Sequence, residues 1–260
     1  MTTDFAPTAI DLQRLFELKY GVAPKLGWGP AMRRKFNYFF PDDYYEALVC
    51  NLVDENTSWL DVGCGRNLFP SNRELARSLS ERCKLLVGVE PDPNIQENEF
   101  VHEKVQCSLE EFRIDRTFDL ITMRMVVEHI ENPAEVMAAL QRLTKRGSKI
   151  VIYTVNKWSP VPLVTRMLPF GLHHFVKHLF WQTVERDTFP VKYLMNTKVH
   201  LEKIFQTINC AEVYFSYLED LSIFARCKSF CYADLYLRKL LHKIGLNHPE
   251  RNLLGVYQRV

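Results

Sequence analysis

The chain has 260 residues, of which 47% are hydrophobic and 25% charged, and its formal net charge is +2. This composition is ordinary for a globular protein, and so small a net charge gives no indication of a nucleic-acid partner. No apolar run reaches the roughly 20 residues of a membrane-spanning helix, and the first residues lack a secretory signal. We therefore expect a single globular domain over residues 1–260, located in the cytoplasm and without stable membrane insertion.

The cysteines agree with this location. There are seven of them, an odd number, and none forms a Cys-x-x-Cys pair. Scattered free thiols are typical of a reducing compartment, whereas a disulfide framework or a zinc site needs regular spacing. The sequence predicts no metal site.

The N-terminal part of the chain, residues 1–45, is expected to form a helical lid. Residues 9–20 (AIDLQRLFELKY) have the apolar spacing of a helix, and turn-forming residues follow them. A basic and aromatic run, MRRKFNYFF, comes next. Pro41, Asp42 and Asp43 then open another helix, because proline suits the first turn and acids suit its positive end.

Strands and helices alternate from residue 57 to residue 156. Such alternation predicts a parallel sheet that is covered by helices on both faces. The expected strands are 57–62, 84–90, 100–107, 117–123 and 148–156, and the expected helices are 70–82 and 131–147.

The alternation stops after residue 156. Residues 158–182 are apolar, aromatic and histidine-rich, and their prolines forbid one long helix. The remaining elements are expected to be a helix at 196–208, a strand at 211–219, a helix at 221–245 and a strand at 252–260.

The turn within WLDVGCGRNLFP (residues 59–70) is the first candidate site. Gly63 and Gly65 let the backbone approach a ligand closely, because no Cβ blocks it. A dinucleotide loop needs a third glycine, but Leu68 occupies that position. Asp61 before the turn and Glu90 at the end of the next strand favour a ligand with an ammonium group and a ribose and without phosphate. S-adenosylmethionine (SAM) is such a ligand.

Three segments together resemble a known family. WLDVGCGRN, VGVEPDP and FDLITMRMVVEHIENP are similar to the first, second and fourth motifs of class I SAM-dependent methyltransferases. The resemblance covers residues 57–156 by motif and 210–260 by layout. It implies an α/β fold with a Rossmann-like, seven-stranded, mostly parallel sheet, whose antiparallel last strand lies beside the fifth.

The resemblance also implies how the chain is divided and which residues bind SAM. Residues 57–156 would be the SAM-binding core, 157–210 a helical insertion that builds the acceptor pocket, and 211–260 a strand–helix–strand. The implied SAM contacts are Asp61, Gly63, Cys64 and Gly65 at the methionine end, Glu90 and Pro91 at the ribose, Ser108 and Leu109 at adenine, and Met123 and Arg124 beneath the methionine carbons. Ser108 stands where the family usually has an acid, and Asn67 where it often has glycine.

Methyl transfer to a hydroxyl needs a proton acceptor, and histidine is the usual one near neutral pH. His129 follows Glu128 just past the fourth strand, at the edge where such sheets bind ligands. His173 and His174 lie in the insertion. These four residues are the catalytic candidates. The alternatives are that His129 only orders its loop and that His173 and His174 lie on the outer face of an amphipathic helix.

Three residues are candidates for acceptor binding. Arg33 in the basic run can meet a carboxylate or phosphate of the acceptor, with Tyr38 beside it. Trp158 opens the insertion and can stack on a flat acceptor. The alternatives are a solvated basic turn for the lid and ordinary packing for the aromatic residues.

The sequence thus predicts a SAM-dependent methyltransferase with a small-molecule acceptor, and O-methylation is favoured over N-methylation. The alternatives are a non-methyl-transfer reaction of the sulfonium such as a cyclisation, a non-catalytic partner-binding scaffold, and a nucleic-acid or protein methyltransferase. A homodimer is the hypothesis for self-association, and the lack of a basic stripe argues against nucleic acid.

Overall fold

The computed structural model describes residues 5–22, 24–167, 191–225 and 227–260, the last four residues of the second range by backbone only. Its centre is a seven-stranded sheet with strand order β3-β2-β1-β4-β5-β7-β6. β7 runs antiparallel between β5 and β6, and the other neighbouring pairs are parallel. The predicted fold class, including the place of the antiparallel last strand, is confirmed.

The strands have the following bounds. They are β1 Ser58–Val62, β2 Leu85–Val89, β3 Glu103–Val105, β4 Phe118–Arg124, β5 Thr144–Val155, β6 Cys210–Glu219 and β7 Arg251–Arg259.

The described helices lie mainly between and before these strands. They are α1 Ala9–Tyr20, α2 Trp28–Lys35, α3 Pro41–Leu52, α4 Arg73–Arg82, the 3-10 helix η1 Pro93–Glu97, α5 Pro133–Leu143, α6 Pro160–Met167, α8 Lys198–Gln206 and α9 Lys228–Lys243.

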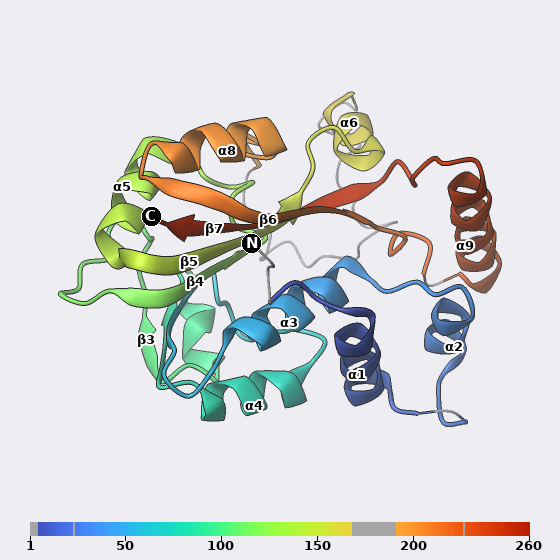
Figure 1. Ribbon diagram of the computed structural model, residues 1–260, viewed down its shortest axis with the longest axis horizontal. Helices are drawn as coiled ribbons and strands as arrows, with labels where there is room; N and C mark the ends of the chain where they lie inside the picture. Colours follow the sequence, from blue (N-terminus) through green and yellow to red (C-terminus); the bar gives the residue numbers. More distant parts are fainter. Residues whose placement is uncertain (1–4, 23, 168–190, 226) are drawn as a thin grey trace.

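Helices cover both faces of the sheet (Figure 1). α5 and α8 pack on one face, and α3 and α4, with α1 outside them, pack on the other. Each face has its own apolar core because side chains alternate along a strand. In β1, Leu60 belongs to the core under α5 and α8, whereas Trp59 belongs to the core under α3 and α4. Asp61 therefore shares the face of Trp59.

Two helix ends differ from the prediction. The helix expected through residue 147 ends at Leu143, and β5 begins directly at Thr144. The hydroxyl of Ser148 donates to the carbonyl of Phe118 at 2.6 Å, so this segment pairs with β4 instead of extending the helix. The helix expected from residue 221 begins at Lys228. The backbone N–H of Leu221 donates to the Tyr38 hydroxyl at 2.9 Å, so this residue is held outside the helix.

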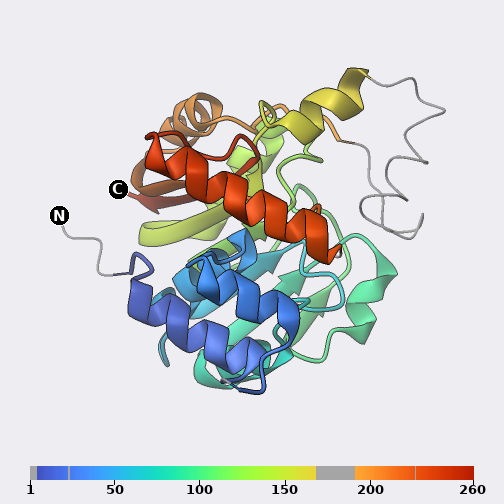
Figure 2. The same ribbon diagram turned by 90° about the vertical axis from the view of Figure 1, so that its right-hand side faces the viewer.

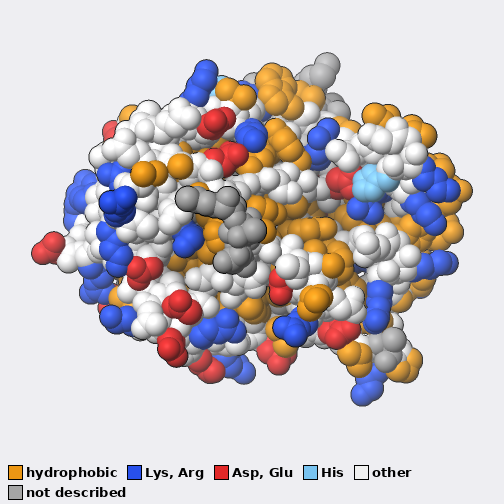
Figure 3. All heavy atoms as spheres, viewed as in Figure 1, with side chains coloured by type: hydrophobic (Ala, Val, Ile, Leu, Met, Phe, Trp, Pro, Cys, Tyr) orange, Lys and Arg blue, Asp and Glu red, His pale blue; other side chains and the backbone are white. Residues whose placement is uncertain are grey.

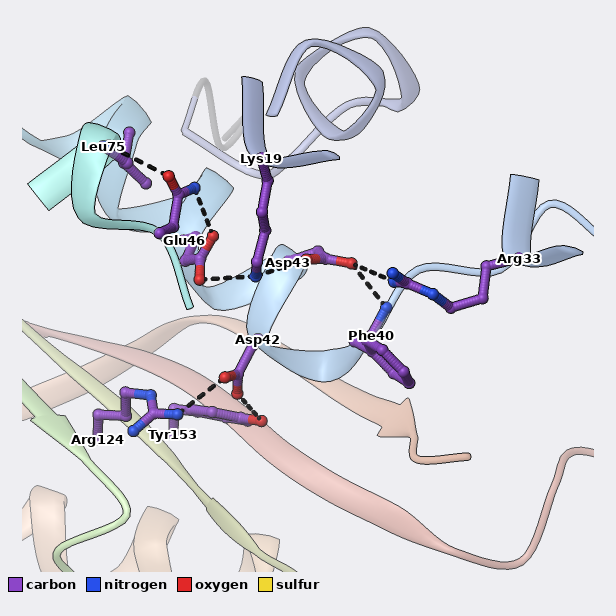
Figure 4. A network of polar contacts seen from close by, with 10 residues as sticks. Lys19, Arg33, Phe40, Asp42, Asp43, Glu46, Leu75, Arg124 and Tyr153 are labelled. Carbon is purple, nitrogen blue, oxygen red and sulfur yellow. Dashed lines mark hydrogen bonds and ion pairs between the residues drawn. The ribbon is translucent and has the colours of Figure 1, made fainter. Parts of the chain in front are cut away.

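A buried polar network joins α1 to the first turn of α3 (Figure 4). The Lys19 ammonium lies 2.9 Å from a carboxylate oxygen of Asp43 and 2.9 Å from one of Glu46, and all three side chains are almost fully buried. Burial disfavours the ammonium, but the two carboxylates outweigh this and raise the pKa of Lys19 above its ordinary value. Asp43 also accepts from the Phe40 backbone N–H at 2.9 Å. The network fixes the entry of the chain into α3.

α2 and α9 together form a structure at the carboxyl edge of the sheet that we call the α2–α9 cap. Figure 2 shows α9 in red crossing in front of the strands, with the blue N-terminal helices beside it. Tyr38, Leu221, Cys231 and Leu235 form its small buried cluster. The Phe36 and Tyr232 rings meet edge to face at 5.6 Å, so residues nearly 200 positions apart in the chain belong to one unit.

Replacing Lys19 with methionine is expected to lower the free energy of unfolding by about 3 kcal/mol, because two buried carboxylates lose their common counter-ion. The loss should grow from about pH 5 to about pH 8, since burial already raises the pKa of Glu46 and its ionised form then lacks a partner. Urea denaturation measures both effects.

The matched control is Lys145→Met, which removes an ion pair with Asp119 whose two side chains are exposed by 53% and 36%. This control should change stability little, since exposed pairs contribute little. Equal effects of the two substitutions would contradict the structural role of the Lys19 network.

Candidate active site

The carboxyl ends of β1 and β2 bring together three residues of the predicted cofactor site. Gly63 follows β1, and its N–H donates to the Val89 carbonyl at 2.8 Å. The Gly65 N–H donates to a carboxylate oxygen of Glu90 at 3.2 Å. The glycine turn and the acid at the end of β2 are therefore in direct contact, as the motif spacing predicts.

The turn needs glycine at Gly63 for two reasons. Its φ is +71°, in the left-handed region that disfavours other residues, and a Cβ there would overlap the side chain of Val126. The turn is also held from below by Asn98, a fully buried residue whose amide donates to the carbonyls of Cys64 and Gly65 at 3.2 and 3.0 Å. The backbone is thus shaped before any ligand binds.

Asp61 is oriented by a one-way chain of hydrogen bonds. Asp61 and Thr122 are register partners on β1 and β4, so their side chains meet on one face. The Trp59 indole N–H donates to the Thr122 hydroxyl at 2.7 Å, and this hydroxyl lies 2.5 Å from an Asp61 oxygen. Because the indole can only donate, it takes a lone pair of Thr122 and leaves the hydroxyl proton for Asp61.

The environment of Asp61 favours a bound cation. Its side chain is 4% exposed, and burial raises its pKa to about 7, with the Thr122 hydroxyl acting in the opposite direction. Arg124 favours the ionised form, but among the described residues Asp61 makes no ion pair, so a ligand that brings a positive charge would stabilise this buried carboxylate. The ammonium of SAM's methionine end fits this requirement.

Glu90 lies beside Asp61 at the end of the neighbouring strand. One oxygen accepts from the Gly65 N–H, and the other accepts from the Asp92 N–H at 3.0 Å. Burial raises the pKa of Glu90 despite these two donors. Each carboxylate oxygen has two acceptor positions, so capacity remains for the two hydroxyls of a ribose.

Arg124, at the end of β4, links this edge to the N-terminal helices (Figure 4). Its guanidinium lies 2.8 Å from one oxygen of Asp42, and the other oxygen accepts from the Tyr153 hydroxyl at 2.8 Å. Burial favours the neutral acid, but Arg124 and Tyr153 outweigh it and hold the pKa of Asp42 below its ordinary value. Met123, the preceding residue, is buried in the core beneath the site.

Glu128 and His129 lie in the loop after β4. Glu128 is 5% exposed and accepts from the Thr154 hydroxyl at 2.7 Å, and Thr154 in turn accepts from the Asn196 amide at 2.7 Å. The Glu128 carbonyl accepts from the Lys192 N–H at 2.7 Å. Burial raises the pKa of Glu128. Glu128 thus ties the loop to β5 and to residues 192–196, while the half-buried His129 follows it.

The other expected cofactor residues lie around the same edge. Cys64 is buried, and a Cβ at Gly88 would come within 2.7 Å of its sulfur, so Gly88 makes room for it. The Pro91 carbonyl accepts from Gln106 at 3.4 Å.

Ser108 and Leu109 are the residues expected at adenine. Ser108 is half-buried and exchanges hydrogen bonds with Glu111, and Leu109 is a core residue. Their contacts with adenine stay a prediction.

Of the three residues expected to bind the acceptor, Arg33 and Tyr38 are buried neighbours, and the Tyr38 N–H donates to the Arg33 carbonyl at 2.9 Å. The Arg33 side chain is 5% exposed, lies 3.4 Å from Asp43 and is stacked on aromatic rings, 4.0 Å from that of Phe40. The Tyr38 hydroxyl donates to the Glu219 carbonyl at 3.1 Å. The Arg33 contacts lie within the lid, whereas the Tyr38 contact joins the lid to the end of β6. Trp158 is 62% exposed and lies beside Lys157.

Two of the four catalytic candidates cannot be placed. His173 and His174 lie outside the described residues, as do residues 168–190 of the expected insertion.

Four residues that support the site were not singled out from the sequence. They are Asp42, Asn98, Thr122 and Asn196. Only Asp42 had a visible signal, its place after Pro41 at a helix start, and that signal indicated a capping role rather than a partner for Arg124.

Within the described part of the chain there is no group of three or more His, Cys, Asp or Glu side chains that could hold a metal ion. None of the described helices has the length and apolar character needed to span a bilayer.

Comparison with known proteins agrees with this geometry. A family model described as "Methyltransferase domain" matches residues 30–211, most of the chain. The chain belongs to this methyltransferase family. Together with the carboxylates and glycine turn at the ends of β1 and β2, this makes it a SAM-dependent methyltransferase, and the non-catalytic scaffold and the cyclisation are not favoured.

Curated relatives and solved structures extend the comparison. Ubiquinone biosynthesis O-methyltransferases of Saccharophagus degradans and Nitrosococcus oceani are 26% and 28% identical, over 54% and 50% of this chain and 67% and 59% of their own. Magnesium protoporphyrin IX methyltransferase of Synechocystis PCC 6803, solved with bound S-adenosylhomocysteine (SAH), matches with a TM-score of 0.50 and 12% identity over 98% of this chain and 96% of its own. A SAM-dependent methyltransferase of Archaeoglobus fulgidus matches with a TM-score of 0.52 and 15% identity over 90% and 100%. At these identities the two structures show the shared fold.

The binding of SAH is expected to weaken as the pH falls. We expect the Asp61 carboxylate to attract the ligand's ammonium, and its pKa of about 7 means that it takes up a proton below neutral pH. The dissociation constant should therefore rise about tenfold from about pH 8 to about pH 6. Calorimetric titration at both pH values measures this change.

Asp61→Asn is the matched variant, because asparagine keeps the shape of the side chain and has no carboxyl group that titrates. It should bind SAH more weakly at both pH values and lose most of the pH dependence. A wild type whose affinity is the same at both pH values would contradict the assignment of Asp61 to the ammonium.

Proposed function

We propose that this enzyme transfers the methyl group of SAM to a hydroxyl of a small molecule. The observation that carries the proposal is the pair of carboxylates, Asp61 and Glu90, at the ends of adjacent strands beside a glycine turn that admits a ligand. The names of the O-methyltransferase relatives support oxygen over nitrogen as the acceptor atom. Bound SAM would supply an electrophilic methyl group.

The chain's own residues would supply position and proton transfer. Asp61 would hold the ammonium, Glu90 the ribose hydroxyls, and the backbone of Gly63 and Gly65 the space between them. His129 would accept the proton of the acceptor hydroxyl, since it lies just beyond β4 on the carboxyl edge. Glu128 would be a positioning residue, because its carboxylate is buried against Thr154.

His173 and His174 stay candidates for the acceptor side, and the insertion that contains them remains the proposed acceptor pocket. The division into a lid (1–45), a SAM-binding core (57–156), an insertion (157–210) and a C-terminal strand–helix–strand (211–260) is kept as part of the proposal. The acceptor is proposed to be a small molecule rather than nucleic acid, because the net charge is only +2. Cytoplasmic location and a homodimer are also proposed, the former supported by seven free cysteines.

The test is methyl transfer from SAM to phenols such as catechol and to amines such as aniline, with products identified by mass spectrometry. We expect products that carry one added methyl group on oxygen. His129→Gln should lower kcat by about a hundredfold or more and leave SAH affinity unchanged, as loss of a general base does.

The matched control is His200→Gln, an exposed histidine on α8, which should leave kcat unchanged. Methylation of amines alone would contradict the choice of oxygen. A full rate in His129→Gln would contradict the role of His129.

A further inference from the structure

The outward face of α9 is apolar, which is the reverse of an ordinary surface helix. Cys231 and Leu235 turn inward and are buried in the α2–α9 cap. The opposite side carries large apolar side chains that are 42% to 70% exposed. These residues, which we call the α9 face, are Phe230, Tyr236, Leu237, Leu240 and Ile244.

The α9 face is continuous, since Phe230, Leu237, Leu240 and Ile244 follow one another at intervals of seven, three and four residues. Leu246 and Tyr232, exposed by 55% and 44%, extend it at its end and along one side. Isolated exposed apolar residues are common, but a contiguous apolar surface of this kind marks an interaction site.

Positive charge lies beside the α9 face. α2 carries the exposed Arg34 and Lys35 next to the buried Arg33, and α9 carries four Lys or Arg residues, whereas the two helices contain one acid, Asp234. That acid lies 3.1 Å from the ring of His248. Nearby Glu219 is engaged by Arg238 at 2.6 Å and by His242 at 2.8 Å. Lys228, Lys239 and Lys243 remain exposed along the flank of α9.

Figure 3 shows this end of the molecule at the right, where orange apolar and blue basic side chains meet with little red between them. Figure 2 shows that α9 is the outermost element on this side. A helix standing out from the body with apolar side chains outward and lysines beside them is suited to a broad, flat, negatively charged partner.

We propose that the α9 face docks this enzyme on the surface of an anionic phospholipid bilayer. Apolar and aromatic side chains would enter the boundary between headgroups and acyl chains, and the flanking lysines would meet the negative headgroups. A second copy of the chain fits less well, because a two-fold contact would place this basic surface against itself. The proposal concerns where the enzyme works and does not depend on the acceptor atom.

The experiment is flotation of the full chain with phosphatidylcholine vesicles that contain or lack phosphatidylglycerol. We expect binding to vesicles with phosphatidylglycerol, much weaker binding without it, and a decrease as salt is raised. The triple variant Leu237→Ser, Leu240→Ser and Ile244→Ser should bind at least about tenfold more weakly, because it removes apolar area from the contact.

The matched control replaces three exposed apolar residues elsewhere, Ile10→Ser, Leu194→Ser and Val199→Ser, and should bind as the wild type does. Lys239→Glu with Lys243→Glu should weaken binding, and Arg146→Glu with Lys203→Glu should weaken it less. Thermal unfolding and SAH titration of each variant establish that its fold and cofactor site are intact.

Three results would overturn the proposal. One is a wild type that fails to bind the phosphatidylglycerol vesicles, and another is binding that the α9 triple variant leaves unchanged. The third is a dimer in sedimentation velocity that the triple variant alone converts to monomer, because a second copy would then cover the α9 face.

Discussion

The first turn of α3 holds the cofactor edge and the N-terminal helices in one arrangement. Two successive carboxylates point in different directions there. Asp43 is buried between Lys19 and Arg33, and Asp42 reaches Arg124 and Tyr153 at the ends of β4 and β5. Removing one member of such a network leaves a buried charge without its partner, which is more costly than losing a surface ion pair. The ion pairs of Asp42 and Asp43 therefore hold the N-terminal helices in place against the sheet.

The candidate cofactor site is also positioned by a few contacts, in this case between neighbouring strands. Parallel pairing of β1 with β4 places Thr122 opposite Asp61, and pairing of β1 with β2 places Glu90 beside the glycine turn. The strands thus position both carboxylates without help from flexible loops. Among the described residues Asp61 makes no ion pair, although Arg124 favours its ionised form, whereas Asp42 pairs directly with Arg124. This is the difference we expect between a carboxylate that binds a ligand and one that supports the fold.

Much of this arrangement could be predicted from the sequence, because it depends on local patterns. The helix over residues 9–20, the alternation from 57 to 156 and the glycine turn all follow from periodicity or backbone freedom. The antiparallel last strand came from the family resemblance. Helix ends were less predictable, since the end of α5 depends on a contact between Ser148 and Phe118 that lies 30 residues away in the chain.

Long-range contacts account for the rest. Nothing near Arg33 in the sequence indicates that its guanidinium will be enclosed by the rings of Tyr20 and Phe40, so its role in the lid was not foreseen. The same holds for α9, whose apolar spacing predicts a helix without showing which side faces outward. Asp42 was expected to cap a helix, and its contact with Arg124, 82 positions away, needed the fold.

The central claim is that SAM binds at the ends of β1 and β2, and calorimetric titration of SAH tests it most directly. The account predicts micromolar binding to the wild type and affinity at least about tenfold weaker in Glu90→Ala, a loss of about 1.4 kcal/mol or more. Glu97→Ala, which removes an exposed acid a few residues away, should bind as the wild type does. Absence of SAH binding in the wild type, or equal affinity in the wild type and Glu90→Ala, would contradict the account.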